Sequence, residues 1–427
     1  MRIAIIGAGI VGVTSAFELA RDGHDVTVIE QRSSVAEETS FANAGVVAPG
    51  YVTPWAAPGM PAKVLKHLVS RHAPVRLARP LGPSEWRWMW RWWRACRPEV
   101  YQANRSRMHQ LARYSHERLR GLSQELNLEY EQSRGYMVLL RGSKDLKLAR
   151  GSLKLLAELG VKFKLIDAEA ARRIEPGLNP EAPLHAAVHL PDDEVGNCRQ
   201  FAHLLRAEAQ RLGATFRFQQ QVCAIHPGSR PELTVLAAGS PLTETQRESF
   251  DGIVVCAAMG SRPLLDELGC RLPMTAVHGY SITAPLRVHE ACPELGPMTG
   301  VMDERYKVAI SRMGSRVRVA GSAELGGRID QHSDAAIQTL YKVLDDWFPG
   351  CAQLGQVQLW KGARPMMPDG PPIIGTSGLE GVWLNLGHGS SGWALACGSA
   401  RVLADQLAGK APAIDPQGLG LARWQGA

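Results

Sequence analysis

The chain has 427 residues, 45% hydrophobic and 21% charged, which is the composition of a globular protein long enough for two sizeable domains. Its 48 basic and 41 acidic side chains give a mild net charge of +7, which suits acidic substrates or an anionic surface. The sequence contains no basic-aromatic module of a known kind, so this charge does not indicate nucleic acid binding. No apolar run approaches the roughly 20 residues that span a bilayer, and the eight scattered cysteines contain no Cys-x-x-Cys pair, so we expect reduced thiols in a cytoplasmic protein.

The first thirty residues predict a strand, a helix and a second strand. Arg2–Ile6 reads as a short buried strand, apolar residues at helical spacing follow as far as Gly23, and Val26–Ile29 reads as a second strand that ends at Glu30. Because the first strand starts so close to the first residue, we expect no cleavable leader sequence.

Glycines fill the turn between this strand and the helix. Gly7, Gly9 and Gly12 have the spacing G-x-G-x-x-G, which allows a tight turn, close approach of a pyrophosphate and close packing of the helix on the strand. The helix N-terminus adds free N–H groups and the positive end of the helix dipole. A carboxylate at Glu30 suits the ribose hydroxyls and disfavours a 2′-phosphate, so the unit predicts FAD or NAD rather than NADP.

A loop of small and hydroxyl residues follows, with the sequence Glu38-Thr39-Ser40-Phe41-Ala42-Asn43-Ala44-Gly45. Such residues suit close backbone contact with a second phosphate or a flavin ring. Together with the glycine turn, this E-T-S-x-x-N-A-G segment resembles the FAD-binding segment of the D-amino-acid oxidase superfamily, and within it the bacterial D-amino-acid dehydrogenases. The Pro-rich, aromatic stretch 49–59 strengthens the resemblance and would be rigid enough to wall a pocket.

Five tryptophans lie in the thirteen residues from Ser84 to Cys96. On a helical wheel Arg87, Arg91 and Arg94 share one face and the tryptophans take up the rest, which is typical of a helix lying at a membrane surface. The alternative is an amphipathic helix whose aromatic side packs on the next predicted helix, Arg105–Leu122, with its arginines in water. The two readings are compatible. The membrane reading predicts a peripheral protein on the inner face of the bacterial cytoplasmic membrane.

The middle of the chain departs from the nucleotide-binding pattern. The acidic run Asp192-Asp193-Glu194 lacks the partner spacing of a metal site, and we expect a solvated turn there, before a helix capped by Asn197. Further on, the segments Thr275–Ala284, Val301–Ser311 and Val317–Ser322 have the alternation and short turns of one antiparallel sheet.

A second glycine loop, Gly387-His388-Gly389-Ser390-Ser391-Gly392, opens a predicted helix from Trp393 to Leu407. Its N–H groups and helix dipole form an anion site, which suits the negative charge that a reduced flavin accumulates at its N1 and C2=O locus. Two such loops in one chain favour FAD, since NAD would need only the first.

These patterns predict an α/β plus α+β fold, in which a Rossmann-like FAD-binding domain is interleaved with an antiparallel-sheet substrate domain. We assign residues 1–50, 195–265 and 360–427 to the FAD-binding domain, and residues 51–194 and 266–359 to the substrate domain.

The resemblance implies an activity and catalytic residues. In this superfamily the arginine of the Gly-x-Arg-Pro motif, here Arg364, pairs with the substrate carboxylate, and Tyr306, Tyr51 and Tyr280, in falling order, are candidates to orient that carboxylate or close the pocket. The implied reaction is FAD-dependent oxidation of D-amino acids to 2-oxo acids and ammonia, by hydride transfer from Cα to flavin N5 without an obligatory side-chain base. The basic, Trp-rich helix favours a membrane quinone over O₂ as electron acceptor.

The resemblance also implies the cofactor contacts. Val222 would approach the adenine, Gly260 ends a buried segment beside the nucleotide, and His388 would contact the flavin ring. The implied set, which includes no metal ligand, is Gly7, Ala8, Gly9, Ile10, Val11, Gly12, Glu30, Gln31, Thr39, Ser40, Asn43, Ala44, Gly45, Val222, Gly260, Gly387, His388, Gly389 and Gly392.

Two departures from the family pattern leave the substrate range open. Ser390-Ser391 stands where a threonine-leucine pair is expected, and His278 replaces an expected lysine before Gly279-Tyr280. The alternative functions are a flavoprotein acting on a cyclic or N-substituted D-amino acid or another amine, an oxidase that uses O₂, and a non-catalytic flavin-binding subunit.

Overall fold

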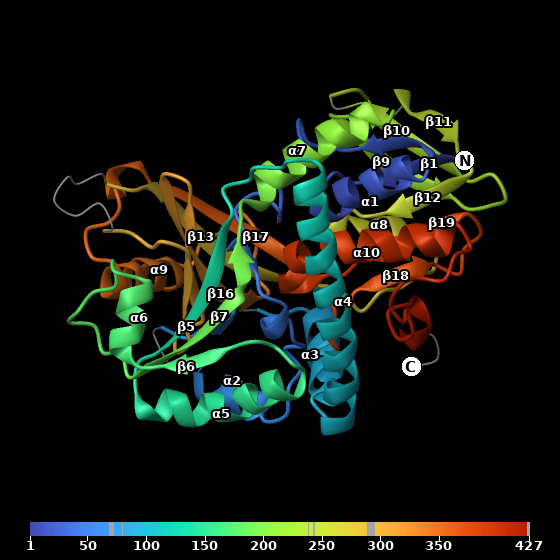
Figure 1. Cartoon of the computed structure of the whole chain (residues 1–427). Coiled ribbons are helices and arrows are strands. Elements are labelled where there is room, and N and C mark those ends of the chain that lie inside the picture. Colours follow the sequence, from blue (N-terminus) through green and yellow to red (C-terminus); the bar gives the residue numbers. More distant parts are fainter. Residues whose placement is uncertain (68–71, 79, 238, 242–243, 288–294, 425–427) are drawn as a thin grey trace.

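The computed structural model describes residues 1–67, 72–78, 80–237, 239–241, 244–287 and 295–424. Within these ranges the strands form a six-stranded sheet, a three-stranded sheet and a ten-stranded sheet. In Figure 1 the six-stranded sheet and its helices lie at the upper right, the large sheet lies to the left, and the long helix α4 (Pro98–Glu125) runs between them in front.

The six-stranded sheet is the nucleotide-binding unit that the glycine pattern predicts. Its strands β19, β12, β1, β2 and β8 are parallel and β18 is antiparallel at one edge. The order across the sheet is β18 (Ile373–Thr376), β19 (Val382–Leu386), β12 (Gly252–Val255), β1 (Arg2–Ile6), β2 (Asp25–Ile29) and β8 (Thr215–Arg217). β1 and β2 are apolar along nearly their whole length because both faces of a parallel sheet are covered.

Three helices form the core on one face of this sheet. α1 (Ile10–Arg21) packs between α7 (Cys198–Arg211) and α10 (Gly392–Leu407), and α10 packs in turn on α4. The small antiparallel sheet of β9 (Gln220–His226), β10 (Glu232–Ala237) and β11 (Gln246–Ser249) lies beside β2, whose end it meets where Gln220 N donates to Glu30 O at 3.0 Å.

The large sheet is mixed rather than purely antiparallel, because β14 pairs in parallel with β5 and β4 pairs in parallel with β16. The main path is β17 (Gln358–Met366), β13 (Thr275–Pro285), β16 (Arg316–Leu325), β15 (Val308–Met313), β14 (Gly300–Asp303), β5 (Ser133–Leu140), β7 (Ala186–Val195) and β3 (Val46–Val47), with β4 (Val75–Leu77) and β6 (Lys164–Ile166) paired beside it.

One face of the large sheet is covered by α9 (Asp334–Trp347), whose Leu340, Val343 and Trp347 are fully buried against the apolar side chains of the strands. We call this the outer face. The opposite, inner face meets the segment 39–44 of the nucleotide-binding part, because Ser281 Oγ donates to Ala42 O at 2.7 Å and Ser311 Oγ donates to Ala44 O at 2.9 Å.

The peripheral helices lie around the lower part of Figure 1. They are α2 (Met60–His67), α3 (Pro83–Ala95), α5 (Ser143–Glu158) and α6 (Ala168–Ile174), while the short α8 (Ser261–Asp266) follows β12. None of the described helices combines the length and apolar character that crossing a membrane requires. The seven cysteines in the described ranges are unpaired, and Cys292 lies outside those ranges.

Three sequence expectations differ from the structure. Gln358–Met366 pairs with β13, so the predicted boundary at 360 falls inside a strand of the large sheet. The predicted strand Val301–Ser311 is a hairpin of β14 and β15 with Tyr306 in its turn. Asp193 and Glu194 are not in a solvated turn: they belong to β7 and are 4% and 5% exposed, because β7 continues to Val195 to pair with β3.

Candidate active site

The glycine turn between β1 and α1 is shaped to receive a phosphate group. Gly7 has φ +99°, and a Cβ at Gly12 would lie 1.9 Å from the Gly7 carbonyl oxygen, so the helix sits closer to the strand than any side chain permits. A Cβ at Gly7 would lie 3.0 Å from Ala257 Cα in the segment that leads from β12 to Gly260. The residues present therefore form the cradle that the pyrophosphate of FAD needs.

Glu30 is held at the end of β2, facing this turn. Its Oε2 accepts a hydrogen bond from Ala8 N at 2.7 Å, and its Oε1 accepts one from Arg32 N at 2.8 Å. Burial raises the pKa of Glu30, while the two backbone N–H groups oppose that rise. The neighbouring Gln31 is exposed and donates to Glu38.

The segment Thr39–Gly45 joins the nucleotide-binding part to the large sheet. Ser40 Oγ accepts from Ile10 N, the first residue of α1, at 3.0 Å, and Thr39 Oγ1 donates to Ala363 O at 2.8 Å. Gly45 has φ +73°, and a Cβ there would lie 2.2 Å from Met313 Cε. The small residues that the sequence singled out are thus required by the close approach of the two sheets.

The second glycine loop lies between β19 and α10. Gly387 has φ +77° and Gly389 has φ +58°, and side chains there would meet Met367 Cγ at 2.8 Å and Met366 Sδ at 2.6 Å. His388 is 3% exposed, its Nε2 lies 2.9 Å from Ser399 Oγ in α10, and burial lowers its pKa to about 3. Its neutral imidazole is therefore turned into α10, so a contact with a flavin ring would come from the loop backbone rather than from this side chain.

Arg364, on β17, lies over the inner face of the large sheet. Its Nη1 donates to Ser322 O at 2.9 Å and to His278 O at 3.4 Å. A Cβ at Gly279 would lie only 2.2 Å from Nη2, so the guanidinium needs a glycine at this position. Nε and Nη2 form no hydrogen bond, and the guanidinium no ion pair, with any described residue. Burial lowers the pKa of Arg364 to about 10, which still leaves the guanidinium charged at neutral pH.

Two residues lie beside Arg364: Ser322, which has no signal of its own in the sequence, and Trp55, which belongs to the aromatic stretch 49–59 that the sequence predicts as a pocket wall. Ser322, at φ +60°, lies opposite a bulge between β13 and β16, and its buried Oγ has no hydrogen-bond partner among the described residues. The ring of Trp55, from the Pro-rich loop, lies 5.8 Å from the Arg364 guanidinium carbon. A charged donor and an aromatic wall thus meet at one place, and a carboxylate would pair with the donor.

The structure does not bring the three candidate tyrosines to this place. Tyr280 points to the outer face, where its hydroxyl donates to Glu324 Oε2 at 2.9 Å and accepts from Ser333 N at 3.1 Å. Tyr306 also packs with the outer-face cluster, near the Arg141 guanidinium at 5.1 Å. Successive residues of a strand point to opposite faces, so Gly279 beside Arg364 requires Tyr280 to face away.

Tyr51 lies on the inner side but over a different part of the sheet. Its ring contacts Tyr136 of β5 edge to face, with centroids 6.4 Å apart, and burial raises its pKa well above the ordinary value. β5 is five strands away from β17 in the sheet order, which is about 24 Å at the usual strand spacing. Tyr280 and Tyr306 therefore face away from Arg364, while Tyr51 packs against β5 rather than against β17, the strand that carries Arg364.

Val222 and Gly260 remain predicted cofactor contacts in consistent positions. Val222 is in β9, which begins beside Glu30, and Gly260 closes the short 3-10 turn Ala258–Gly260 after β12. Both segments flank the glycine turn.

Residues 2–406 match the profile of a family described as DAO, FAD dependent oxidoreductase. The chain is 40% identical over 430 residues to a protein named D-amino acid dehydrogenase from Rhizorhabdus wittichii, covering 99% of this chain and 100% of the relative. It is 41% identical over 428 residues to a protein of the same name from Cereibacter sphaeroides, covering 99% and 95%.

Among solved structures, the chain is similar to glycine oxidase from Geobacillus kaustophilus, with a TM-score of 0.74, 18% identity, and coverage of 99% of this chain and 98% of that one. At that identity the likeness shows the fold alone, and it confirms the fold class that the sequence predicts.

Proposed function

Because this chain belongs to the DAO family of FAD-dependent oxidoreductases, we propose that it is a D-amino acid dehydrogenase that converts D-amino acids to 2-oxo acids and ammonia. Full-length relatives of that name at 40% and 41% identity support the substrate class. In the complete reaction the amino acid loses two electrons and two protons, and water replaces nitrogen at Cα, so that ammonia leaves.

The observation that carries the proposal is the unpaired Arg364. Two backbone carbonyls hold its Nη1, which fixes the plane of the guanidinium and leaves Nε and Nη2 to bind a carboxylate. The absence of a side chain at Gly279 leaves the room that Nη2 occupies. In this role Arg364 binds the substrate carboxylate and orients Cα.

FAD bound along the two glycine loops and the segment Thr39–Gly45 would supply the two-electron acceptor, by hydride transfer from Cα to its N5. The chain's own residues position the substrate and exclude water around Cα. Arg364 forms no ion pair with any described carboxylate, and in the proposed reaction the neutral amine of the substrate itself assists the oxidation.

We test the proposal by mixing purified holoenzyme with D- and L-amino acids without oxygen and following the flavin absorption band. D-alanine or a similar D-amino acid should bleach the band, with slow reoxidation in air and fast reoxidation by a quinone. Bleaching only by D-proline or an N-alkyl amine would move the assignment to another amine substrate, and no bleaching by any of them would refute the proposal.

Arg364→Lys should lower kcat/KM for D-alanine by about 100-fold or more while FAD stays bound, because lysine cannot form the bidentate pair. Arg271→Lys, at an exposed position, is the matched control and should leave kcat/KM unchanged. If the Arg364→Lys variant kept the wild-type kcat/KM, Arg364 would not be the residue that binds the substrate carboxylate.

We propose further that electrons pass to a membrane quinone and that α3 makes a peripheral contact with the inner face of the cytoplasmic membrane. The helix divides its tryptophans between two environments. Trp88 is 7% exposed and its Nε1 donates to Met366 O at 2.9 Å. The buried side packs on Val277, Ala323 and Leu325 of the large sheet, and not on the helix that the sequence suggested as its partner.

The other side of α3 supports the membrane contact. Trp86, Trp90 and Trp93 are 58%, 53% and 59% exposed and lie one helical turn apart on one face. The arginines at 87, 91 and 94 flank this face, and the Arg94 guanidinium lies 4.8 Å from the Trp90 ring centroid. Large exposed aromatic side chains beside cations suit the interface of an anionic bilayer.

Replacing these three tryptophans by serine should weaken binding to phosphatidylglycerol vesicles by at least tenfold in a sedimentation assay, without changing bleaching by D-alanine. The matched control replaces three exposed leucines elsewhere, Leu148, Leu165 and Leu212, by serine. Equal vesicle binding by the tryptophan variant and the wild type would refute the contact.

A further inference from the structure

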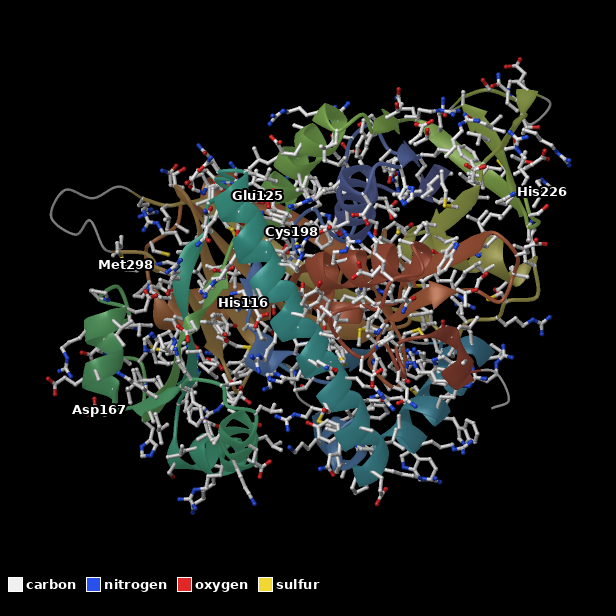
Figure 2. The ribbon with its side chains drawn as sticks, turned by 45° about the vertical axis from the view of Figure 1, so that its right-hand side comes forward. His116, Glu125, Asp167, Cys198, His226 and Met298 are labelled. Carbon is white, nitrogen blue, oxygen red and sulfur yellow. The ribbon has the colours of Figure 1, made fainter. Side chains whose placement is uncertain are left out.

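A hollow of about 430 Å³ lies where the N-terminus of α7 meets the inner face of the large sheet. Figure 2 labels Cys198, the first residue of α7, between the two β regions. The side chains that matter for its chemistry are Phe41, Glu131, Arg199, Gln200, Arg316 and Arg318.

The hollow carries more positive than negative charge. Its one carboxylate, Glu131, is already occupied: Arg316 Nη2 donates to it at 2.8 Å and Asn197 Nδ2 at 2.6 Å. Arg199 and Arg318 form no ion pair with any described residue. Two guanidinium charges therefore remain without a counter-charge.

Arg199 and Arg318, which lack ion pairs, are held by other contacts. Arg318 is 4% exposed, its Nε donates to Thr283 Oγ1 at 3.0 Å and its Nη1 to Asn43 O at 3.2 Å. Burial, reinforced by the neighbouring Arg316 and Arg199, lowers the pKa of Arg318 to about 10. The Arg199 guanidinium lies 4.3 Å from the Phe41 ring centroid, and its buried Nε has no hydrogen-bond partner.

The hollow is separate from the place where Arg364 lies. Gln358, at the rim of the hollow, is six residues before Arg364 on β17, which is about 20 Å along a strand. The rings of Phe41 and Trp360 stack between the two places, with centroids 6.4 Å apart.

We propose that this hollow binds a small organic anion that carries a carboxylate and no ammonium group, such as a 2-oxo acid. Arg199 and Arg318 supply charged donors from two walls, and the Gln200 amide, whose oxygen is unpaired, can turn either end toward the ligand. A zwitterionic amino acid fits less well. The arginines would repel its ammonium group, and the one carboxylate in the hollow, Glu131, is already paired. The choice of a 2-oxo acid rests on the proposed function, whose product it is.

Through the contact between Arg318 and Asn43, a bound anion can change the electrostatic environment of the cofactor. Because Arg318 donates to the Asn43 carbonyl, an anion on Arg318 changes the charge next to the segment that is expected to line the flavin. The hollow would therefore let a reaction product bind outside the substrate site and perturb the flavin.

The test uses FAD-loaded Arg364→Ala protein, in which the substrate anchor is gone, and titrates pyruvate by calorimetry. We expect saturable binding that a further Arg199→Gln change weakens at least tenfold. Arg211→Gln, on the same helix but paired with Glu208 outside the hollow, is the matched control and should not change the affinity. Arg199 is partly exposed, so its replacement is not expected to prevent folding.

Three results would overturn the proposal: no saturable pyruvate binding to Arg364→Ala holoenzyme, unchanged affinity after Arg199→Gln, or equal binding of D-alanine. Binding of inorganic phosphate without pyruvate would overturn the carboxylate assignment. None of these measurements requires turnover, so they are decided independently of whether wild-type enzyme oxidises D-amino acids.

Discussion

Asp193 shows how one buried carboxyl group affects the stability of the whole chain. It lies near the end of β7, is 4% exposed, and its Oδ2 has no hydrogen-bond partner among the described residues. Burial raises its pKa to about 8, and Asp192 and Glu194 add to the rise while Arg120 opposes it. The folded chain thus keeps a proton on Asp193 at a pH where the unfolded chain has lost it.

The sign of the pH effect follows from this difference. A carboxyl pKa that is higher in the folded state contributes stability below the ordinary pKa of 3.8, and that contribution is lost as pH rises to about 8. Asp193→Asn has no proton to lose and should not show this loss. The difference between the free energies of unfolding of the variant and the wild type should therefore shift in favour of the variant from pH 5 to pH 8, by on the order of a few kcal/mol.

The measurement is the denaturation midpoint in urea at several pH values. Asp25→Asn, at an exposed carboxylate, is the control and should not alter the pH slope. Parallel curves for the wild type and Asp193→Asn would show that Asp193 is ionised in the folded protein.

Arg364 and the tyrosines show which residue roles the sequence can predict. Arg364 was identified through a local motif, and the structure places it over the inner face, without an acidic partner among the described residues. The tyrosines were chosen by residue type, and their directions depend on features that no local pattern reveals. A bulge between His278 and Tyr280 and a turn at Tyr306 decide where those side chains point.

At the scale of single elements, the β1–α1 turn depends on Gly12. Gly12→Ala would place a Cβ 1.9 Å from Gly7 O, so α1 must move away from β1. We expect loss of bound FAD and destabilisation by about 1–3 kcal/mol, measured as flavin absorbance per chain and as the free energy of unfolding.

Gly121→Ala is the matched control. Gly121 is near the C-terminal end of α4, is exposed, and an added Cβ there meets no atom within 4 Å. Alanine should keep FAD and raise the stability by about 0.5–1 kcal/mol. A Gly12→Ala protein that purifies with one flavin per chain would contradict the role assigned to this turn.

Elements with a strong local pattern were predicted well. The strand Arg2–Ile6, the helix that ends at Leu407 and the Asn197 cap, whose side chain accepts from Gln200 N, all follow from short-range chemistry. Pairing between distant segments was not predicted. β17 pairs with β13, and the end of β7 that holds Asp193 pairs with β3. These partners lie far apart along the chain, so the pairing leaves no local periodicity in the sequence.

At the scale of the whole molecule, the cofactor segments connect the two large sheets. The segment 39–45 accepts hydrogen bonds from β13, β15 and α1, and Trp393 Nε1 at the start of α10 donates to Gly45 O at 3.2 Å. A ligand that lies along these segments would therefore contact both halves of the fold at once (Figure 1).

This arrangement predicts that FAD removal destabilises the chain as a unit. FAD binds the folded chain and not the unfolded chain, so free FAD at 100 times its Kd should stabilise the protein by about 2.7 kcal/mol, and Tm should rise with FAD concentration. Hydrogen exchange in the cofactor-free protein should be faster across residues 39–47. NAD is the control ligand: it should raise Tm less than FAD at the same concentration, because it can occupy only the first glycine turn and leaves the second glycine loop and the segment 39–45 without a partner. Equal Tm values with and without FAD would mean that these segments hold their positions without the cofactor, and that the two sheets are joined by protein contacts alone.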